Sequence, residues 1–207
     1  MIHDAAAAGF SADGATGAYE RGRPPYPGAV VERLIEVCRL APGRDAVDLA
    51  AGTGRLTRLL APTGARVVAV EPVAAMRDAL RSACPGIDVL DGTAESIPLP
   101  DRSADAVTVG QAFHWFDGPA ALAEIARVLR PGGTLALIWN VQNGLTAWID
   151  RVLTITHAAN TDGAPQYDTG QWRAAFGETA LFGPIAEHQP SPPGRWTSRP
   201  CLIASRR

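Results

Sequence analysis

The stretch VDLAAGTGRLTRLL, residues 47–60, joins the end of an apolar strand to the start of a helix through a turn that holds two glycines. Gly52 and Gly54 lack side chains, so the backbone can turn tightly there and a ligand can approach its amides closely. Thr57 stands where a dinucleotide-binding turn has its third glycine, and the spacing is not that of a phosphate-binding loop. The turn therefore favours a ligand without a pyrophosphate.

Outward from this turn, apolar runs alternate with segments of helical periodicity. The sequence predicts strands over residues 45–50, 65–72, 86–92, 104–111 and 134–140. The run at 65–72 is continuously apolar, as a strand buried on both faces requires. Apolar residues at helical spacing predict helices over 28–41, beginning at Leu56, Leu59 and Leu60, over 73–84, and around Leu122, Ile125, Ala126 and Leu129. Five strands interleaved with helices predict an α/β fold, a doubly wound and mostly parallel sheet with helices on both faces.

Composition and charge exclude several classes of protein. A chain of 207 residues with 46% hydrophobic content is long enough to bury one sizeable core. The formal net charge is −2 and the isoelectric point is about 6.1, so we expect no nucleic-acid partner and no binding to an anionic membrane. All 19 cationic residues are arginine, which excludes a lysine Schiff base or a lysine general base.

The cysteines and the N-terminus bear on the compartment. Cys38, Cys84 and Cys201 are odd in number and widely spaced, which argues against a disulfide framework or a zinc site; we expect no metal. The first residues show no signal peptide, and no apolar run approaches the roughly 20 residues that span a bilayer. We therefore expect a soluble, cytoplasmic protein.

Acidic residues stand where a ligand would bind in such a sheet, at the carboxyl ends of strands. Glu71 follows the second strand, 17 residues after Gly54, where a carboxylate can accept both hydroxyls of a ribose; the alternative is an acid facing solvent. Asp48 lies inside an apolar strand and needs partners there, either loop amides or an ammonium group of a ligand. Met76 has two equally consistent roles: it packs in the core, or it packs against the face of an adenine ring.

Four segments in this order and spacing resemble the class I S-adenosylmethionine-dependent methyltransferases: VDLAAGTGRLT, VVAVEP, DGTAESIPLPDRSADAVTVGQAFHWFD and LRPGGTLALIWN. YERGRPPYP (19–27) and QAFHWFD resemble the type 11 small-molecule branch, with its ubiquinone-biosynthesis and trans-aconitate-like members. The resemblance covers roughly residues 15–145. It implies one domain over 1–190 with S-adenosylmethionine as cofactor and an N-terminal lid over about 1–40.

The resemblance also assigns roles to particular residues. It implies that the cofactor is bound by Asp48, Ala50, Gly52, Gly54, Glu71, Pro72, Met76, Thr93, Ala94, Glu95 and Gln111. Thr93 stands where the family commonly has an aspartate, which leaves the backbone amide of Ala94 as a partner for the adenine edge. Tyr19, Arg23 and Tyr26 belong either to a mobile lid or to a capping segment with a rigid proline turn.

Methyl transfer is an in-line displacement at a carbon activated by a positive sulfur, so the protein mainly holds the reactants together and excludes water. A carboxylate acceptor needs no base, whereas a phenol, alcohol or carbon acid gains roughly 10²–10⁴-fold from one. His114 is the candidate base, with packing in an aromatic loop as its alternative role. Trp115 is a candidate wall for the acceptor. Trp139 and Asn140 end the fifth strand and are candidates for the same wall, although Trp139 is equally consistent with the core.

The C-terminal part departs from the family. Residues 182–189 fit a sixth strand, but 190–207 are rich in proline, serine and arginine, which favours disorder or a surface strap. Within that tail, which we separate as 191–207, only CLIAS (201–205) fits a short strand. We therefore expect the C-terminal strands to be incomplete and hypothesise that the native C-terminus was lost, for example through a frameshift.

The expected function is transfer of the methyl group of S-adenosylmethionine to an oxygen or carbon of a small-molecule acceptor. The expected protein is a monomer or weak homodimer with no nucleic-acid or membrane partner. One alternative is a protein that binds the cofactor but has impaired or no catalysis because its C-terminal strands are missing. A nicotinamide-dependent oxidoreductase is a further alternative, against which the absent third glycine speaks.

Overall fold

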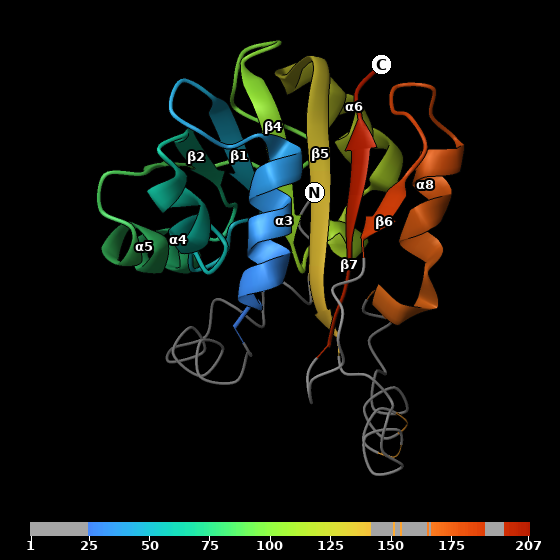
Figure 1. Cartoon of the computed structure of the whole chain (residues 1–207), viewed down its shortest axis with the longest axis horizontal. Helices are drawn as coiled ribbons and strands as arrows, with labels where there is room; N and C mark the ends of the chain where they lie inside the picture. Colours follow the sequence, from blue (N-terminus) through green and yellow to red (C-terminus); the bar gives the residue numbers. More distant parts are fainter. Residues whose placement is uncertain (1–24, 142–150, 152–153, 155–164, 166, 189–196) are drawn as a thin grey trace.

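The computed structural model describes residues 25–141, 151, 154, 165, 167–188 and 197–207. Seven strands form one sheet in the order β3-β2-β1-β4-β5-β7-β6 (Figure 1). The strands are β1 (Asp45–Leu49), β2 (Arg66–Val70), β3 (Asp88–Leu90), β4 (Ala104–Gly110), β5 (Leu129–Val141), β6 (Ala186–His188) and β7 (Thr197–Ser205). The first five pair in parallel, whereas β7 runs antiparallel to both β5 and β6. The prediction of an α/β fold with a mostly parallel, doubly wound sheet is confirmed.

Helices cover both faces of the sheet. They are α3 (Gly28–Cys38), α4 (Thr57–Leu60), α5 (Ala74–Ala83), α6 (Gly118–Val128) and α8 (Ala174–Gly177), with single 3-10 turns η1 (Ala61–Thr63), η2 (Phe113–Trp115), η3 (Tyr167–Thr169) and η4 (Gln171–Arg173). The buried residues of α3 and α4 share one core cluster, and those of α6 and α8 share another. In the view of Figure 1, α3 crosses in front of the strands.

Alternation along β5 shows how one apolar run serves both layers. Leu135, Leu137 and Trp139 pack with α6, whereas Ala136 and Ile138 pack with α3. A parallel strand covered on both faces therefore needs apolar residues at successive positions, which is why the runs in the sequence are continuous.

The helices after the first two loops differ from the prediction in detail. The helix begun near Leu56 is a single turn, α4, followed by η1, whose first turn contains Pro62. Leu59 does not face the core, since it is 37% exposed, while Thr57 is buried in its place. The earlier helix α3 ends at Cys38 rather than at residue 41 because Arg39 adopts a left-handed conformation with φ 51°.

Three strands also differ in extent from the predicted runs. β5 begins at Leu129, which pairs with Ala104, and regular pairing resumes at Thr134 opposite Ala106 after a register shift. The run at 86–92 contains the three residues of β3, and the run at 182–189 contains the three residues of β6.

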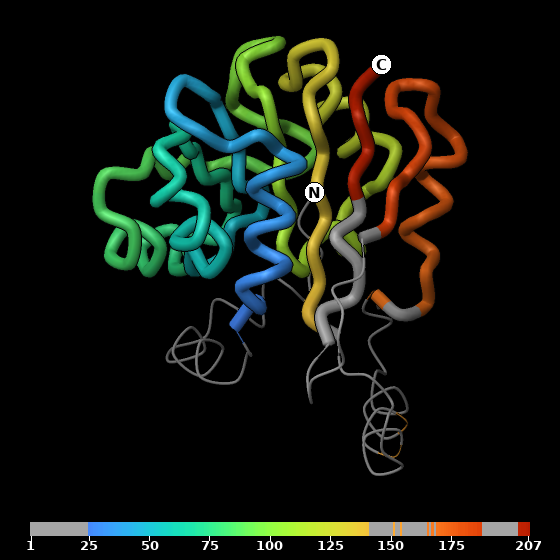
Figure 2. Tube along the Cα trace, viewed as in Figure 1, coloured from blue at the N-terminus to red at the C-terminus, as the bar shows by residue number. Residues whose placement is uncertain are grey.

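The expectation of incomplete C-terminal strands is wrong. β7 occupies the place between β5 and β6, and Figure 2 shows the C-terminal segment between them. Leu137 pairs with Leu202 and Trp139 pairs with Arg199, so Pro200 falls at the irregularity between these pairs. A proline is tolerated at such a point because a bulge does not require its missing N–H. The strap or disordered tail inferred from composition is thus a strand of the sheet from residue 197 to 205.

Three further properties of the described residues concern membranes, metals and cysteines. No helix there is both long and apolar enough to cross a membrane. Those residues also hold no group of three or more His, Cys, Asp or Glu side chains arranged to hold a metal ion. Cys38 and Cys84 are both buried thiols that form no disulfide.

Candidate active site

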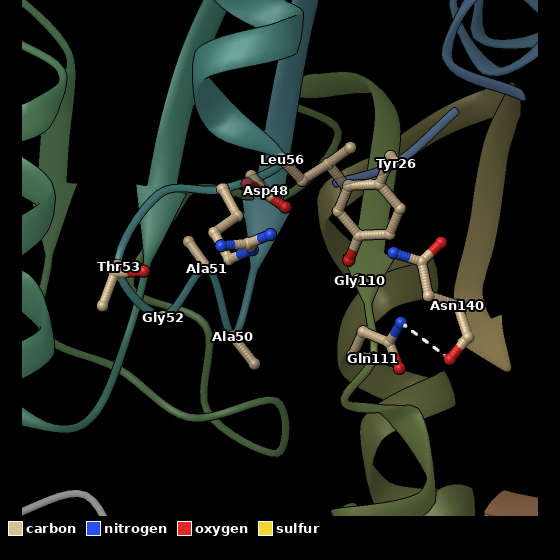
Figure 3. A pocket seen from close by; sticks show the side chains of 11 residues that line it. Tyr26, Asp48, Ala50, Ala51, Gly52, Thr53, Leu56, Gly110, Gln111 and Asn140 are labelled. Atoms are coloured by element: carbon tan, nitrogen blue, oxygen red, sulfur yellow. Dashed lines mark hydrogen bonds between the residues drawn. The ribbon is translucent and has the colours of Figure 1, made fainter. Parts of the chain in front are cut away.

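A cleft opens at the carboxyl ends of β1, β4 and β5, where the strand order reverses between β1 and β4. This switch point is where open α/β sheets bind their ligands. The empty space of the cleft, part of it open to solvent, is about 530 Å³. Figure 3 shows the lining residues, which are Tyr26, Asp48, Ala50, Ala51, Gly52, Thr53, Arg55, Leu56, Gly110, Gln111 and Asn140.

The turn after β1 contains three residues in the left-handed region: Ala50 (φ 54°), Gly52 (φ 58°) and Gly54 (φ 84°). A Cβ placed on Gly52 would have no other heavy atom within 4 Å, so this glycine faces open space in the cleft. A Cβ on Gly54 would lie 3.0 Å from Leu80 Cγ and 3.1 Å from Cys84 Sγ. Gly52 therefore leaves room for a ligand, whereas Gly54 lets the loop pack against α5.

Asp48 places a carboxylate at the floor of the cleft with 1% of its surface exposed. Its Oδ2 accepts a hydrogen bond from Thr57 Oγ1 at 2.6 Å, and its Oδ1 accepts one from Thr108 Oγ1 at 3.2 Å. Burial raises the pKa of Asp48 to about 6, because the hydrogen bonds from Thr57 and Thr108 offset that burial only in part. A cation bound in the cleft would favour the charged carboxylate.

Glu71 fastens the glycine turn to the end of β2. The Gly52 amide donates to its Oε2 and the Val73 amide donates to its Oε1, each at 2.9 Å. Burial raises the pKa of Glu71, while the two amide bonds and the charge of Arg77 act in the opposite direction. Glu71 is 5% exposed and does not line the cleft. Each carboxylate oxygen can accept a further hydrogen bond, and the ribose contact stays a prediction.

The far wall of the cleft is built from the ends of β4 and β5. Gln111 turns the chain after β4 with a φ of 63°, and its side-chain amide donates to the Asn140 carbonyl at 3.3 Å (Figure 3). The Asn140 side chain donates to the Pro25 carbonyl at 3.2 Å. The Tyr26 hydroxyl would lie 2.6 Å from a Cβ on Gly110, so a side chain there would displace Tyr26. The segment before α3 is therefore attached to the strand ends.

An aromatic cluster adjoins this wall. Trp139 is 1% exposed, and its ring centroid lies 4.7 Å from those of both Tyr167 and Trp172. The Trp139 indole N–H donates to His114 Nδ1, with 3.3 Å between the nitrogens. Of the two alternatives for Trp139, the structure favours the core over the wall of the cleft.

The cleft brings together Asp48, Ala50, Gly52, Gln111 and Tyr26 from the predicted site, as well as Asn140. The predicted residues outside its lining are Gly54, Glu71, Pro72, Met76, Thr93, Ala94, Glu95, His114, Trp115 and Trp139. Met76 and Ala94 are buried, and Glu95 Oε1 accepts a hydrogen bond from the Asp117 amide. Tyr19 and Arg23 lie outside the described residues. The roles assigned to these side chains stay predictions.

Sequence reasoning missed Ala51, Thr53, Arg55, Leu56 and Gly110 in the lining. Two of them carried a signal. Arg55 directly follows the second glycine of the turn, and Gly110 ends a strand at the predicted ligand-binding edge, where a missing side chain leaves space. Ala51, Thr53 and Leu56 line the cleft because of the path that the loop takes, and their residue types do not indicate that path.

Comparison with known proteins agrees with this geometry. Residues 47–137 match the family described as "Methyltransferase domain". This segment of the chain therefore resembles a class I methyltransferase domain. An uncharacterized methyltransferase of Mycobacterium tuberculosis is 51% identical over 135 residues, which are 65% of this chain and 54% of the relative. A malonyl-[acyl-carrier protein] O-methyltransferase of Serratia marcescens is 37% identical over 107 residues, 51% of this chain and 42% of that one.

The methyltransferase fold also occurs in solved structures. A geranyl diphosphate C-methyltransferase of Streptomyces coelicolor, in complex with Mg²⁺, geranyl diphosphate and S-adenosyl-L-homocysteine, has a TM-score of 0.62 and 16% identity, covering 86% of this chain and 78% of that one. At that identity the likeness concerns the fold alone. The chain spans about half the length of the curated relatives named above.

Proposed function

We propose that this protein transfers the methyl group of S-adenosylmethionine to an oxygen or carbon of a small-molecule acceptor by in-line displacement. The observation that carries the proposal is the cleft at the switch point, where the open Gly52 turn adjoins the buried carboxylate of Asp48. The methyltransferase domain over 47–137 supports the same reaction class. The alternative of a domain impaired by missing strands loses its basis, since β6 and β7 are present.

The residues fit the cofactor in two respects. The space above Gly52 would admit a ligand against the backbone amides of the turn. Burial raises the pKa of Asp48, and the positive charge of an ammonium or sulfonium group would stabilise its ionised carboxylate. When bound, the cofactor supplies a methyl group on a positively charged sulfur. Asp48, Ala50, Gly52 and Gln111 would hold its methionine end, while Glu71 lies beside the turn toward β2.

The protein's own contribution to such a transfer is positioning and exclusion of water. Tyr26 and the Gln111–Asn140 pair close one side of the cleft, and the glycine turn closes the other (Figure 3). The name of the Serratia marcescens relative supports an oxygen as the methylated atom. We further propose a cytoplasmic monomer or weak homodimer that acts without nucleic-acid or membrane partners, as the composition indicates.

Calorimetric titration of the full chain with S-adenosylmethionine and S-adenosylhomocysteine tests the cofactor. A turnover assay then measures S-adenosylhomocysteine formed with carboxylic acids, phenols and alcohols as acceptors. We expect saturable binding of both compounds and product with at least one acceptor class. Failure to bind either compound would refute the proposal at the cofactor, and binding without product from any acceptor would refute it at the reaction.

A further inference from the structure

The hydrogen bond between Trp139 and His114 fixes more than packing. Trp139 is fully buried and packs against the rings of both Tyr167 and Trp172, so the direction of its indole N–H is set by its surroundings. A buried indole N–H needs an acceptor, and here that acceptor is His114 Nδ1 at 3.3 Å.

This bond assigns the tautomer of the neutral imidazole. One ring nitrogen of a neutral histidine carries the proton and the other carries the lone pair, and the partner of one nitrogen decides which. Because Nδ1 accepts from Trp139, its lone pair is used and the proton lies on Nε2. His114 is therefore a hydrogen-bond donor through Nε2, whereas a general base would need a lone pair there.

Both members of the pair are close in sequence to residues that line the cleft. Trp139 directly precedes Asn140, and His114 comes three residues after Gln111; Gln111 and Asn140 line the cleft and hydrogen-bond to each other. The left-handed turn at Gln111 leads the chain into η2, which contains His114. The donor is thus attached to the two strand ends that form the far wall.

On the basis of the proposed methyl transfer, we propose that Trp139 is a positioning residue that keeps His114 as an Nε2–H donor, and that the acceptor is a carboxylate. In the reaction, a carboxylate oxygen forms a bond to the methyl carbon while the bond from that carbon to sulfur breaks. The products are a neutral methyl ester and neutral S-adenosylhomocysteine. No proton is removed, so a donor that orients the anionic oxygen is sufficient and a base is not needed.

The tautomer is tested without turnover, by ¹⁵N NMR of the histidine side chains in the full chain. The His114 signals are assigned by their loss in His114→Gln. We expect neutral His114 to carry its proton on Nε2 and to lose this preference in Trp139→Phe. Trp172→Phe is the matched control, because it deletes an indole N–H in the same cluster that donates to the Tyr167 carbonyl instead. A proton on Nδ1 in the unmodified protein overturns the inference, even if Trp139→Phe fails to fold.

Turnover tests the acceptor class and the donor role. Glutamine at position 114 retains an N–H donor but cannot act as a base, whereas phenylalanine supplies neither. We expect carboxylic acids to be methylated, His114→Gln to stay within about tenfold of the unmodified protein, and His114→Phe to lose about 10- to 100-fold. Equal losses of about 10²–10⁴-fold in both variants, as a general base requires, would overturn the donor role. Methylation of phenols or alcohols, with no carboxylic acid methylated, would overturn the acceptor class and leave the proposed function intact. Failure to bind S-adenosylmethionine would instead refute the proposed function.

Discussion

Asp48 lies in β1 with its carboxylate buried, and its pKa of about 6 is above the ordinary value of 3.8. Between about pH 4 and pH 6 the folded protein therefore holds a proton that the unfolded chain has released, so this group lowers the free energy of unfolding as the pH rises through that window. We predict that Asp48→Asn is more stable than the unmodified protein at pH 8 by roughly 1–3 kcal/mol, and that most of this difference disappears near pH 4.

Urea unfolding of both proteins at the two pH values measures the difference. An equal stability change at both would show that the carboxylate ionises freely in the fold. The same substitution removes the negative charge beside the proposed sulfonium, so we expect it to weaken S-adenosylmethionine binding at least tenfold in calorimetry. A stabilised protein with weakened binding would be the expected outcome for a functional carboxylate whose burial destabilises the fold.

The two glycines of the turn make a matched pair for separating binding from folding. Gly52→Ala adds a methyl group into open space and costs only left-handed strain, about 1–2 kcal/mol. Gly54→Ala causes similar strain and also brings a methyl group within about 3 Å of Leu80 and Cys84. We therefore expect it to lower the free energy of unfolding by about 2–4 kcal/mol. We predict that Gly52→Ala raises the dissociation constant of S-adenosylmethionine at least tenfold, and by more than Gly54→Ala does. Gly52→Ala nevertheless destabilises the fold less than Gly54→Ala. Thermal melts and calorimetry of both variants would contradict this if affinity simply followed stability.

At the scale of elements, β7 ties the C-terminal part of the sheet together. It pairs with β5 along most of its length and is the neighbour through which β6 joins the sheet. Ala204 belongs to the same buried cluster as Leu135 and the α6 residues. We predict that removal of residues 197–207 abolishes cooperative thermal unfolding, because it leaves β5 as an exposed edge and β6 without a partner.

A point substitution tests the same element more gently. Ala204→Asp buries a charge in the cluster and should cost about 3–5 kcal/mol, whereas Ser205→Ala, at an exposed position, should change stability by less than about 0.5 kcal/mol. A truncated protein that still melts cooperatively would indicate that β7 is peripheral to the fold.

The elements that the sequence predicted well are those whose environment is uniform. β1, β2 and β4 are buried on both faces, so their apolar runs marked them directly. β7 was underestimated because its composition includes Arg199 and Pro200. The bulge that accommodates the proline depends on the pairing register with β5, which exists only in the folded sheet. Leu59 was placed on the wrong face because a one-turn helix contains too few residues for periodicity to decide.

At the scale of the whole molecule, the strand ends predicted the place of the cleft but not its full composition. Asp48, Gly52 and Gln111 follow from chain position, since parallel strands end at one edge. The Trp139–His114 bond joins residues 25 positions apart, one on β5 and the other in the 3-10 turn η2 after β4. Residue type at either position gives no indication of that bond, because it depends on the packing of the aromatic cluster.

A fold of this kind binds nucleotide ligands of several classes, so similarity to known proteins does not identify the ligand. The ligand has to be identified by how much its binding stabilises the folded protein. A compound that binds the folded state alone stabilises it by about 2.7 kcal/mol at 100 times its dissociation constant. For a domain of this size that corresponds to a rise in melting temperature of roughly 5–10 °C. We predict such a rise with S-adenosylhomocysteine, a smaller one with Gly52→Ala at the same concentration, and none with NADH. A rise with NADH in place of S-adenosylhomocysteine would assign the cleft to a nicotinamide cofactor, and the buried carboxylate of Asp48 would then lack the cation that we expect it to receive.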